Sequence, residues 1–344
     1  MKVDNDKKLA KKYRVRTWHT MILLVVLVVL YFFKIADYYP DKIDLKHRSD
    51  FFGVTFSTKY CTELGLSWKE TYQAMLNELH AKLIRLPIYW DEIENEEGQF
   101  DFTNYDYLVK TGAEQGAHFV VSIGRRVPRW PECHSPAWLN RQSTADAQQA
   151  TLKMLQTVVE RYRDNPNVEY WQVENEAFLG SFGVCPPLDS EFLEKEFALV
   201  RSLDSRPIII TGSGELGFWK REAKIGDIFG STLYRVVYNS WFGYIKYPLP
   251  YSYYRFKAKR VGLNGDRLMI LELQAEPWVP KGKIIYLTEK EINKTMGLNQ
   301  FQANLQYAIN LNFSRTYLWG VEWWYWQKKY GDPRYWQIAA DLFD

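Results

Sequence analysis

Residues 50–326 alternate between strand-like and helix-like segments, and this alternation predicts a closed (β/α)8 barrel of the TIM type. The strand-like segments are apolar along their whole length, as expected of parallel strands buried on both faces. From Asp50 onward no Gly- or Ser-rich stretch marks a boundary, so one domain is expected. The alternative, an open doubly wound sheet, usually has a Gly-rich turn after its first strand, whereas residues 58–66 read TKYCTELGL.

The strands are assigned to short runs of aliphatic, β-branched and aromatic residues. These runs lie at residues 51–57, 82–90, 117–124, 168–176, 206–214, 228–238, 267–276 and 315–326. The helices between them are assigned from apolar residues at helical spacing. They are expected at residues 67–81, 103–116, 144–164, 189–204, 215–226, 251–262 and 299–312. Ser67 and Glu70 match a capping box at the start of the first helix, and Gly116 suits the C-terminal cap of the second.

The N-terminal segment has the pattern of a membrane anchor. Residues 1–16 hold seven basic and two acidic residues, a net charge of +5, and the apolar run 21–33 carries no charge. Extended back to Thr17, this run reaches the low end of the length that crosses a bilayer. Basic residues stay on the cytoplasmic side, and no small-residue cleavage site follows the run, which favours an uncleaved anchor over a secretory signal peptide. The expected organisation is a cytoplasmic tail, a single transmembrane helix, a linker and a periplasmic or extracellular catalytic domain, at residues 1–16, 17–34, 35–49 and 50–344.

Charge and motif content exclude several classes of function. The formal net charge of the whole chain is +3, so the part that follows the basic tail carries 3 − 5 = −2. A body so close to neutrality has no bulk attraction for nucleic acid. The chain has no Walker-type Gly-rich loop, and its His and Cys spacing fits no zinc motif. We therefore expect no cofactor, no metal, no nucleotide and no nucleic-acid partner.

Three cysteines allow one disulfide and one free thiol. Cys133 and Cys185 fall in the loops after the third and fourth predicted strands, which are neighbours in a barrel of this order. The oxidising compartment implied by the anchor permits a disulfide between them. We expect this pairing, with Cys61 as the free thiol.

Polar residues end two of the predicted strands. In the stretch EYWQVENEAFLGSFG, the fourth strand finishes with Glu174, Asn175 and Glu176, which are residues that strands disfavour. The seventh strand contains Glu272, with Glu276 four residues later. In this barrel the catalytic groups sit at the C-terminal ends of strands, and two carboxyl groups that face each other there are the machinery of glycoside hydrolysis. One must hold a proton while the other is ionised, and a separation of ~5–5.5 Å predicts retention of configuration.

These residues resemble the pattern of the clan A glycoside hydrolases, which share a (β/α)8 barrel. The resemblance covers roughly residues 50–326, and Asn175-Glu176 on strand four with Glu272 on strand seven carries it. It implies that Glu176 is the acid/base, that Glu272 is the nucleophile and that Asn175 binds the 2-hydroxyl of the sugar. Glu276 is the alternative nucleophile.

The same resemblance implies further binding residues. Arg85, in LIRLP on strand two, resembles the clan arginine beside the nucleophile, and Trp319, in YLWG on strand eight, resembles the aromatic floor under the reacting sugar. The tyrosine that touches the nucleophile from strand six is Tyr234 or Tyr238, and Tyr238 is preferred because it lies nearer the end of the predicted strand. Many family 5 members have Trp where this chain has Glu174, and an acidic residue there looks more like the family 42 β-galactosidases.

The loop after strand three, GRRVPRWPECHSPAWL at residues 124–139, is rich in Arg, Trp and Pro. One interpretation is a rigid surface loop. The other is a ligand-binding loop in which Trp130 and Trp138 stack on sugar faces. In that case an arginine of the loop would bind hydroxyl groups or an acidic sugar, the candidates being Arg125, Arg126 and Arg129.

The sequence therefore predicts a membrane-anchored retaining β-glycosidase that hydrolyses a poly- or oligosaccharide outside the cytoplasm. Two alternatives remain open at this point. One is a non-catalytic carbohydrate-binding barrel, against which the presence of both carboxyl groups argues. The other is a transglycosylase that remodels a surface polysaccharide, which the residues alone do not distinguish from a hydrolase.

Overall fold

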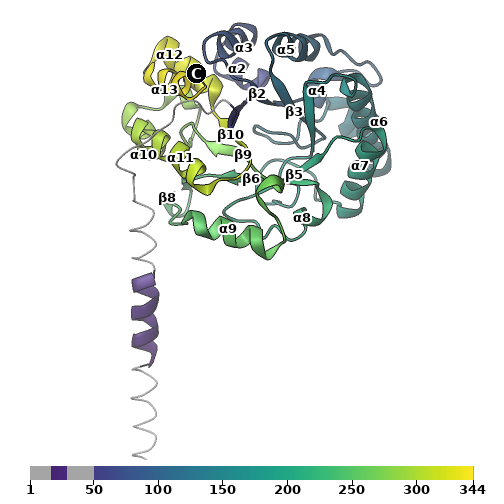
Figure 1. Ribbon diagram of the computed structural model, residues 1–344. Coiled ribbons are helices and arrows are strands. Elements are labelled where there is room, and N and C mark those ends of the chain that lie inside the picture. Colours follow the sequence, from purple (N-terminus) through teal and green to yellow (C-terminus); the bar gives the residue numbers. More distant parts are fainter. Residues whose placement is uncertain (1–16, 29–49, 344) are drawn as a thin grey trace, which may run out of the picture.

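The computed structural model describes residues 17–28 and 50–343. Eight parallel strands form a closed barrel in the order β1-β10-β9-β6-β5-β4-β3-β2 (Figure 1). The strands are β1 (Phe52–Thr55), β2 (Leu83–Pro87), β3 (His118–Ile123), β4 (Val168–Val173), β5 (Ile208–Gly212), β6 (Ile228–Leu233), β9 (Leu268–Gln274) and β10 (Thr316–Trp319). The predicted (β/α)8 fold is confirmed.

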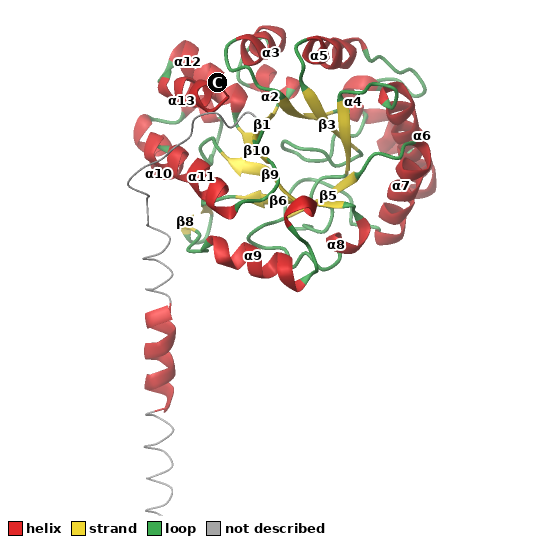
Figure 2. Cartoon of the chain, in the orientation of Figure 1, coloured by secondary structure: helices red, strands yellow, loops and turns green. Residues whose placement is uncertain are grey.

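The helices surround the barrel as an outer ring, and the loops cross the view at its centre (Figure 2). They are α2 (Thr58–Glu63), α3 (Trp68–Asn77), α4 (Trp90–Ile93), α5 (Thr103–Glu114), α6 (Thr144–Tyr162), α7 (Ser190–Leu203), α8 (Glu222–Ile225), α9 (Tyr251–Arg260), α10 (Glu289–Met296), α11 (Leu298–Leu311), α12 (Val321–Tyr330) and α13 (Arg334–Phe343). The longest, α6, buries Met154, Leu155, Val158 and Val159, whose spacing puts them on one face of the helix. Burying such faces stabilises the ring on the sheet.

Two apolar clusters follow from the alternation of side chains along each strand. The larger cluster lies between the sheet and the helices. The smaller one gathers residues from β2, β3, β5, β6, β9 and β10, namely Leu83, Val120, Ile209, Ile228, Met269, Leu271 and Tyr317. Side chains from six strands meet in this way only inside the barrel, which is therefore a packed core with its polar site at one end.

Several element boundaries differ from the prediction. The strand expected at 315–326 ends at Trp319, because Gly320 takes φ +136° and the aromatic residues after it form α12. The strand expected at 228–238 ends at Leu233 and is followed by a hairpin, β7 (Val236–Asn239) with β8 (Gly243–Lys246). The helix expected at 215–226 is reduced to α8. Apolar and aromatic runs do not by themselves distinguish a strand from a buried helix or hairpin, and this ambiguity explains the first two differences.

One predicted cap is half formed. The hydroxyl oxygen of Ser67 accepts a hydrogen bond from the backbone N–H of Glu70 at 3.4 Å, as the capping box requires. The Glu70 carboxylate instead accepts from the hydroxyl of Tyr325 at 2.8 Å and from Lys329 at 3.0 Å. The Glu70 side chain therefore links α3 to α12 and does not accept the hydrogen bond from the backbone N–H of Ser67 that would complete the capping box.

The predicted disulfide is confirmed. Cys133 and Cys185 are bonded, with their Cα atoms 5.3 Å apart, and Cys61 is a buried free thiol. The bond joins the loop after β3 to the loop after β4. The second of these loops begins with the Glu174-Asn175-Glu176 segment of the candidate site.

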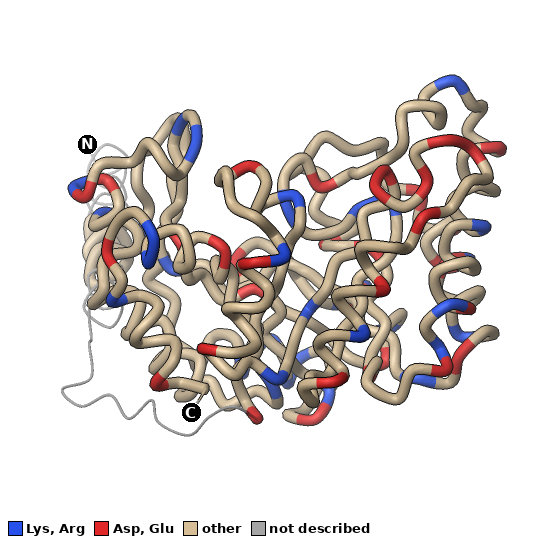
Figure 3. Tube along the Cα trace, turned by 90° about the horizontal axis from the view of Figure 1, so that it is seen from above, with Lys and Arg blue, Asp and Glu red and all other residues tan. Residues whose placement is uncertain are grey.

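Residues 17–28 form a helix whose apolar side chains are exposed, among them Trp18 and Leu23. Within the described parts of the chain, no helix combines the length and the apolar character needed to cross a membrane. Three predicted parts lie outside the described residues: the tail at 1–16, the end of the span at 29–34 and the linker at 35–49. In the view of Figure 3, Lys and Arg are interspersed with Asp and Glu along the trace of the barrel.

Candidate active site

The Glu174-Asn175-Glu176 segment leaves the end of β4 in an unusual backbone conformation. Glu174 and Glu176 have φ of +55° and +44°, a region that residues other than glycine adopt rarely and at a cost. The backbone N–H of Asn175 donates to the carbonyl of Arg126 at 2.7 Å, and that of Glu176 donates to Oγ1 of Thr211 at 2.8 Å. These bonds hold the segment across the barrel mouth. Strained backbone that is held in this way is characteristic of functional sites.

Glu174 itself supports the neighbouring loop. Its carboxylate accepts hydrogen bonds from the backbone N–H groups of Arg125 and Arg126, at 2.6 and 2.8 Å. Gly124 makes this approach possible, because a Cβ there would lie 2.3 Å from a Glu174 oxygen. Burial raises the pKa of Glu174 to about 7. The structure therefore gives Glu174 the role of a hydrogen-bonded anchor for the loop after β3.

Glu272 lies in β9 and is buried, and a β-bulge turns its side chain into the barrel. On the neighbouring β6, Ser231 pairs with Ile270 and the next residue, Thr232, pairs with Glu272, so Leu271 is the extra residue of the bulge. Bulges often redirect a side chain beside an active site. The bulge explains how Glu272 reaches the interior although Leu271 also faces it.

Both carboxylate oxygens of Glu272 meet donors. Nη1 of Arg85 lies 3.0 Å from Oε1, and the hydroxyl of Tyr234 donates to Oε2 at 3.1 Å. Arg85 is fully buried, and its pair with Glu272 is a buried salt bridge. An ionised carboxylate only accepts hydrogen bonds, so this surrounding of donors suits a Glu272 that is charged.

Arg85 also ties the two predicted catalytic segments together. Its Nη2 donates to Oδ1 of Asn175 at 2.8 Å, and its Nε donates to Oε1 of Gln172 at 2.7 Å. Nη1 additionally donates to the carbonyl of Leu271 at 3.0 Å. One guanidinium thus fixes the ends of β2, β4 and β9 relative to one another. The predicted neighbours Arg85, Asn175 and Glu272 do lie together.

Glu176 has the opposite environment to Glu272. It is 6% exposed, and its Oε1 has no hydrogen-bond partner among the described residues. Burial raises its pKa well above the usual value, and the charges of Glu272 and then Glu132 raise it further. Glu176 therefore keeps its proton to a higher pH than an ordinary glutamate does. One proton-bearing carboxyl beside one donor-surrounded carboxylate is the pair that glycoside hydrolysis requires.

Glu276, the alternative nucleophile, belongs to a separate ion cluster. Nη1 of Arg129 lies 2.5 Å from Glu276, and its Nη2 lies 2.8 Å from Glu322. The guanidinium also lies over the rings of Tyr60 and Trp319, at 3.6 and 4.1 Å from their centroids. We name Arg129, Glu276, Glu322, Tyr60 and Trp319 the Arg129 cluster. Within it Trp319 has one face on Arg129, so a sugar floor would use the other face.

The tyrosine that reaches Glu272 is Tyr234, and the prediction of Tyr238 was wrong. β6 ends at Leu233, so Tyr234 is the first residue after the strand and its hydroxyl meets the carboxylate. Tyr238 belongs to β7 of the hairpin, where it packs edge-on against Tyr244 with centroids 5.1 Å apart. The predicted strand at 228–238 ended too late in the chain, and for this reason Tyr238 was preferred over Tyr234.

The loop after β3 contributes less to the site than predicted. Trp138 is half-buried, packs against Trp90 and donates its indole N–H to the carbonyl of Glu94 at 3.1 Å, so it belongs to the wall of the fold. Trp130 is exposed and touches Phe182 at its edge. Among the arginines, Arg126 donates to the carbonyl of Phe182, Arg125 donates to Ser135, and Arg129 lies in its own cluster. Trp130 alone of the two tryptophans remains available to a ligand.

Sequence reasoning missed two carboxyl groups. Oε2 of Glu132 accepts from Nδ2 of Asn175 at 2.9 Å, and burial followed by the charge of Glu272 raises the pKa of Glu132 to about 8. Oε1 of Glu215 accepts from the backbone N–H of Tyr234 at 3.0 Å and from the hydroxyl of Tyr254 at 2.8 Å, and burial raises its pKa to about 7. The sequence held one indication for each residue. Glu132 directly precedes Cys133, a predicted disulfide cysteine, and Glu215 directly follows the predicted strand at 206–214.

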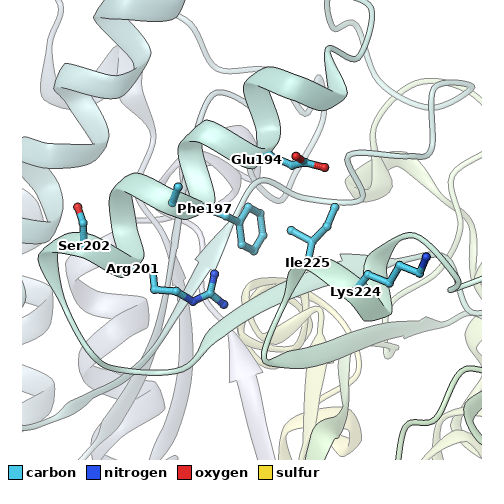
Figure 4. Close-up of a pocket in the computed structure, with 7 residues that line it drawn as sticks. Glu194, Phe197, Arg201, Ser202, Lys224 and Ile225 are labelled. Carbon is cyan, nitrogen blue, oxygen red and sulfur yellow. The ribbon is translucent and has the colours of Figure 1, made fainter.

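A surface hollow on the outside of the barrel is distinct from this site. Figure 4 shows it between α7 and α8, with side chains of both helices around it. Arg201, on its wall, pairs with Asp227 at 2.8 Å. Among residues 17–28 and 50–343, no group of three or more His, Cys, Asp or Glu side chains is arranged to hold a metal ion.

Comparison with known proteins agrees with the chemistry of the site. Residues 46–187 match the family model described as Glycosyl hydrolase family 10. Endo-1,4-beta-xylanase 3 of Hypocrea jecorina is 29% identical over 143 residues, which are 40% of this chain and 39% of the relative. The chain thus spans about two fifths of the length of that relative. The region that the family model matches includes Asn175 and Glu176 but not Glu272. Family 10 differs from families 5 and 42, which the sequence resembled, and belongs to the same clan.

Solved structures share the fold over most of the chain. The beta-galactosidase from Rahnella sp. R3 has a TM-score of 0.58 at 12% identity, covering 88% of this chain and 57% of that chain. Native xylanase 10B from Thermotoga maritima has a TM-score of 0.54 at 15% identity, covering 87% and 96%. At such low identity the likeness supports the barrel alone. The family match is to a glycoside hydrolase family and covers residues 46–187.

Proposed function

We propose that this protein is a retaining β-glycosidase that cleaves a poly- or oligosaccharide by double displacement. The observation that carries the proposal is the contrast between Glu176 and Glu272. Glu272 is surrounded by Arg85 and Tyr234, whereas Glu176 is buried with an unpartnered oxygen and a raised pKa. The environments separate the proton-bearing acid from the ionised nucleophile.

The reaction has two steps. In the first, an oxygen of Glu272 attacks C1 of the sugar, the bond from C1 to the glycosidic oxygen breaks, and the Glu176 proton passes to that leaving oxygen. In the second, the ionised Glu176 takes a proton from water, the water oxygen bonds to C1, and Glu272 leaves as a carboxylate. Two inversions at C1 give net retention, and both carboxyl groups return to their starting states.

The surrounding residues serve these steps without titrating. Arg85 and Tyr234 position the Glu272 carboxylate for attack along one line, and Asn175, held by Arg85, lies beside it. Trp319, at the end of β10, offers an apolar ring face under the sugar. Such positioned groups act mainly by holding reactants in a near-attack geometry.

A β-1,4-linked polysaccharide of the xylan class is the substrate we propose. The match to family 10 and to a protein named as an endo-1,4-beta-xylanase supports this class. Trp130, exposed on the loop after β3, suits stacking on a sugar ring beyond the cleavage point.

Product stereochemistry tests the proposal. The purified full-length protein would be incubated with xylan and with 4-nitrophenyl β-xylobioside, and proton NMR would follow the first anomer released. We expect the β-anomer first, followed by mutarotation. Release of the α-anomer first would contradict the retaining assignment, and transfer to an added acceptor sugar in preference to water would indicate a transglycosylase.

We also propose that residues 17–34 anchor the barrel to a membrane, with the barrel outside the cytoplasm. The exposed apolar side chains of helix 17–28, the +5 charge of residues 1–16 and the Cys133–Cys185 disulfide support this placement. The full chain should sediment with membranes, and protease added to the outer side of the cytoplasmic membrane should reach the barrel. A mature N-terminus beyond residue 33 would show a cleaved signal peptide instead.

A further inference from the structure

The most exposed large apolar side chains of the described chain lie on three neighbouring loops. They are Phe218, Trp241, Phe242 and Tyr286, which are 91%, 88%, 81% and 76% exposed. The loops follow β5, β6 and β9, which are consecutive strands of the barrel, and parallel strands send these loops to the same end. We name the three loops, residues 213–221, 234–250 and 275–288, the β5–β9 rim. Exposed apolar side chains gathered on one edge mark an interaction surface.

The loops of the rim are in contact with one another. The carboxylate of Glu215, after β5, accepts a hydrogen bond from the backbone N–H of Tyr234, the first residue after β6, at 3.0 Å. On the other side, the ammonium group of Lys294 on α10 lies 4.9 Å from the ring centroid of Tyr244 in β8. Since α10 directly follows the loop after β9, the rim is one continuous edge of the barrel mouth.

The backbone of the rim is held in place while its apolar side chains contact water. In the hairpin, Oδ1 of Asn239 accepts from the backbone N–H groups of Trp241 and Phe242, at 2.8 and 3.2 Å. In the loop after β5, Trp219 is fully buried and donates its indole N–H to a backbone carbonyl of the same loop at 2.9 Å, whereas its neighbour Phe218 is exposed. Exposing such side chains to water costs free energy unless a partner covers them.

The exposed charges of the rim have one sign. They belong to Lys220, Arg221, Lys281 and Lys283. The acidic residues of the rim are Glu215 and Glu276, and both are engaged inside the fold, by the hydroxyl of Tyr254 and by Arg129 respectively. The loop after β2, which lies opposite β6 in the barrel order, has the reverse character, because residues 88–102 contain six acidic residues and no basic one. The rim therefore suits a negatively charged partner.

We propose that the β5–β9 rim docks onto an anionic lipid surface. Aromatic side chains favour the membrane interface, and basic side chains next to them are attracted to anionic headgroups. Phe218, Trp241 and Phe242 would enter the interface, with the four basic side chains beside the headgroups. Contact along this edge leaves the far side of the mouth, where Trp130 lies on the loop after β3, open to a polysaccharide. The inference goes beyond the proposed reaction and does not depend on it.

Two other partners fit the rim less well. A ring that stacks on a sugar is best held in one plane, as Trp130 is by its edge contact with Phe182, with centroids 5.9 Å apart. Trp241 is almost fully exposed, and entry into a bilayer interface needs no fixed ring plane. A second copy bound through the same rim would bring like charges together across the two-fold axis, which disfavours that pairing.

The length of chain before the barrel permits the contact. Between helix 17–28 and residue 50 there are 49 − 28 = 21 residues, and a chain of that length reaches at most ~70 Å. The chain enters β1 at the end of the barrel opposite to the rim, and a helix of the outer ring such as α6, with 19 residues, measures only ~28 Å. The rim can therefore reach the same bilayer as the proposed anchor.

The test measures how deeply the hairpin tip enters a bilayer. Ser240→Cys in the full-length protein carries a spin label, and labelling is specific because Cys61 is buried and the other two cysteines are bonded. The protein is placed in nanodiscs of phosphatidylcholine alone or of equal parts phosphatidylcholine and phosphatidylglycerol. Electron paramagnetic resonance gives the ratio of label collisions with oxygen to those with a water-soluble nickel chelate. We expect this ratio to be roughly 3-fold or more higher in the anionic discs, because the chelate is excluded from the apolar phase.

Matched variants separate the rim from the rest of the surface. A label at Gln99, in the acidic loop after β2, should give the same ratio in both discs. Replacing the four exposed basic residues of the rim by Gln should abolish the increase at position 240. The control replaces three Lys and one Arg that are exposed on the outer helices, and it should preserve the increase; these are Lys110, Lys153, Arg163 and Lys195.

Three results would overturn the inference. The first is the same ratio at position 240 in both kinds of disc. The second is protection of the label from the chelate by xylan oligosaccharides in lipid-free detergent, which would make the rim a sugar-binding surface. The third is spin–spin broadening that grows with protein concentration, which would assign the rim to a second copy. No substrate turnover enters the lipid measurement, so a protein that hydrolyses no glycoside would contradict the proposed function alone.

Discussion

Two buried arginines meet carboxylates at the mouth of this barrel, and they differ in how the charges are matched. In the Arg129 cluster one guanidinium pairs with Glu276 and with Glu322 and is packed between two aromatic rings. Arg85 instead pairs with Glu272 alone, and Glu176 has no ion-pair partner among the described residues. The first arrangement satisfies its own charges, which suits a structural role. The second leaves a proton-bearing acid beside a carboxylate, which is the arrangement that the proposed function uses.

The largest difference between the Arg85 region and the Arg129 cluster should be in catalytic activity after one carboxylate is removed from each. We expect Glu272→Gln to lower kcat by roughly 10⁴-fold or more, because no covalent glycosyl-enzyme can form. Glu276→Gln should retain most of the activity. Both would be measured with the same aryl β-glycoside, and full activity in Glu272→Gln together with loss in Glu276→Gln would reverse the assignment.

Glu176→Gln should show a loss that depends on the leaving group. With xylan or a methyl glycoside, whose leaving oxygen needs a proton, the rate should fall by about 10²- to 10⁴-fold. With a 2,4-dinitrophenyl glycoside, which leaves unaided, the first step should be little affected. In Glu176→Gly, azide should restore turnover and release a β-glycosyl azide, whereas an α-glycosyl azide would place Glu176 on the nucleophile side.

Removing a charge from the Arg129 cluster should lower the stability of the folded protein. Glu276→Gln leaves Arg129 with one of its two charged partners, and we expect the free energy of unfolding to fall by about 3 kcal/mol. Denaturant unfolding measures this change. Gln at the solvent-exposed Glu96 is the control, since it makes no ion pair in the described structure, and a loss no larger than that of the control would show that the cluster contributes little.

The smallest expected effect is a change in pH dependence. Burial raises the pKa of Glu215 to about 7, so this group contributes stability below pH 4.5 that is lost as the pH rises through 7. Glu215→Gln should flatten the fall in unfolding temperature between pH 4.5 and 7. An unchanged slope across that range would show that the carboxyl is not held neutral in the folded protein.

The sequence predicted the parts of this structure that depend on local pattern. Eight apolar runs sufficed for the barrel, and strand order alone put Glu176, Glu272 and Arg85 at the same end of it. Adjacent loops in that order likewise paired Cys133 with Cys185.

The features that the sequence did not predict depend on the local backbone conformation in or near the ends of strands, which a periodic pattern does not reveal. A bulge in β9 turns Glu272 inward, and Gly320 converts an aromatic run from strand to helix. Tyr234, and not the predicted Tyr238, contacts Glu272, because β6 ends at Leu233. Glu132 became visible only once the path of its loop was known.

The most direct test of the central claim is covalent labelling of the nucleophile. An activated 2-deoxy-2-fluoro β-glycoside would be incubated with the purified full-length protein, because the fluorine slows both steps and the good leaving group restores the rate of the first alone, so the covalent intermediate accumulates. Digestion and tandem mass spectrometry would then locate the added sugar. The account predicts one sugar per chain on Glu272, and none on the Glu272→Gln variant. A label on Glu276, or hydrolysis of the parent glycoside with no adduct on either residue, would contradict it.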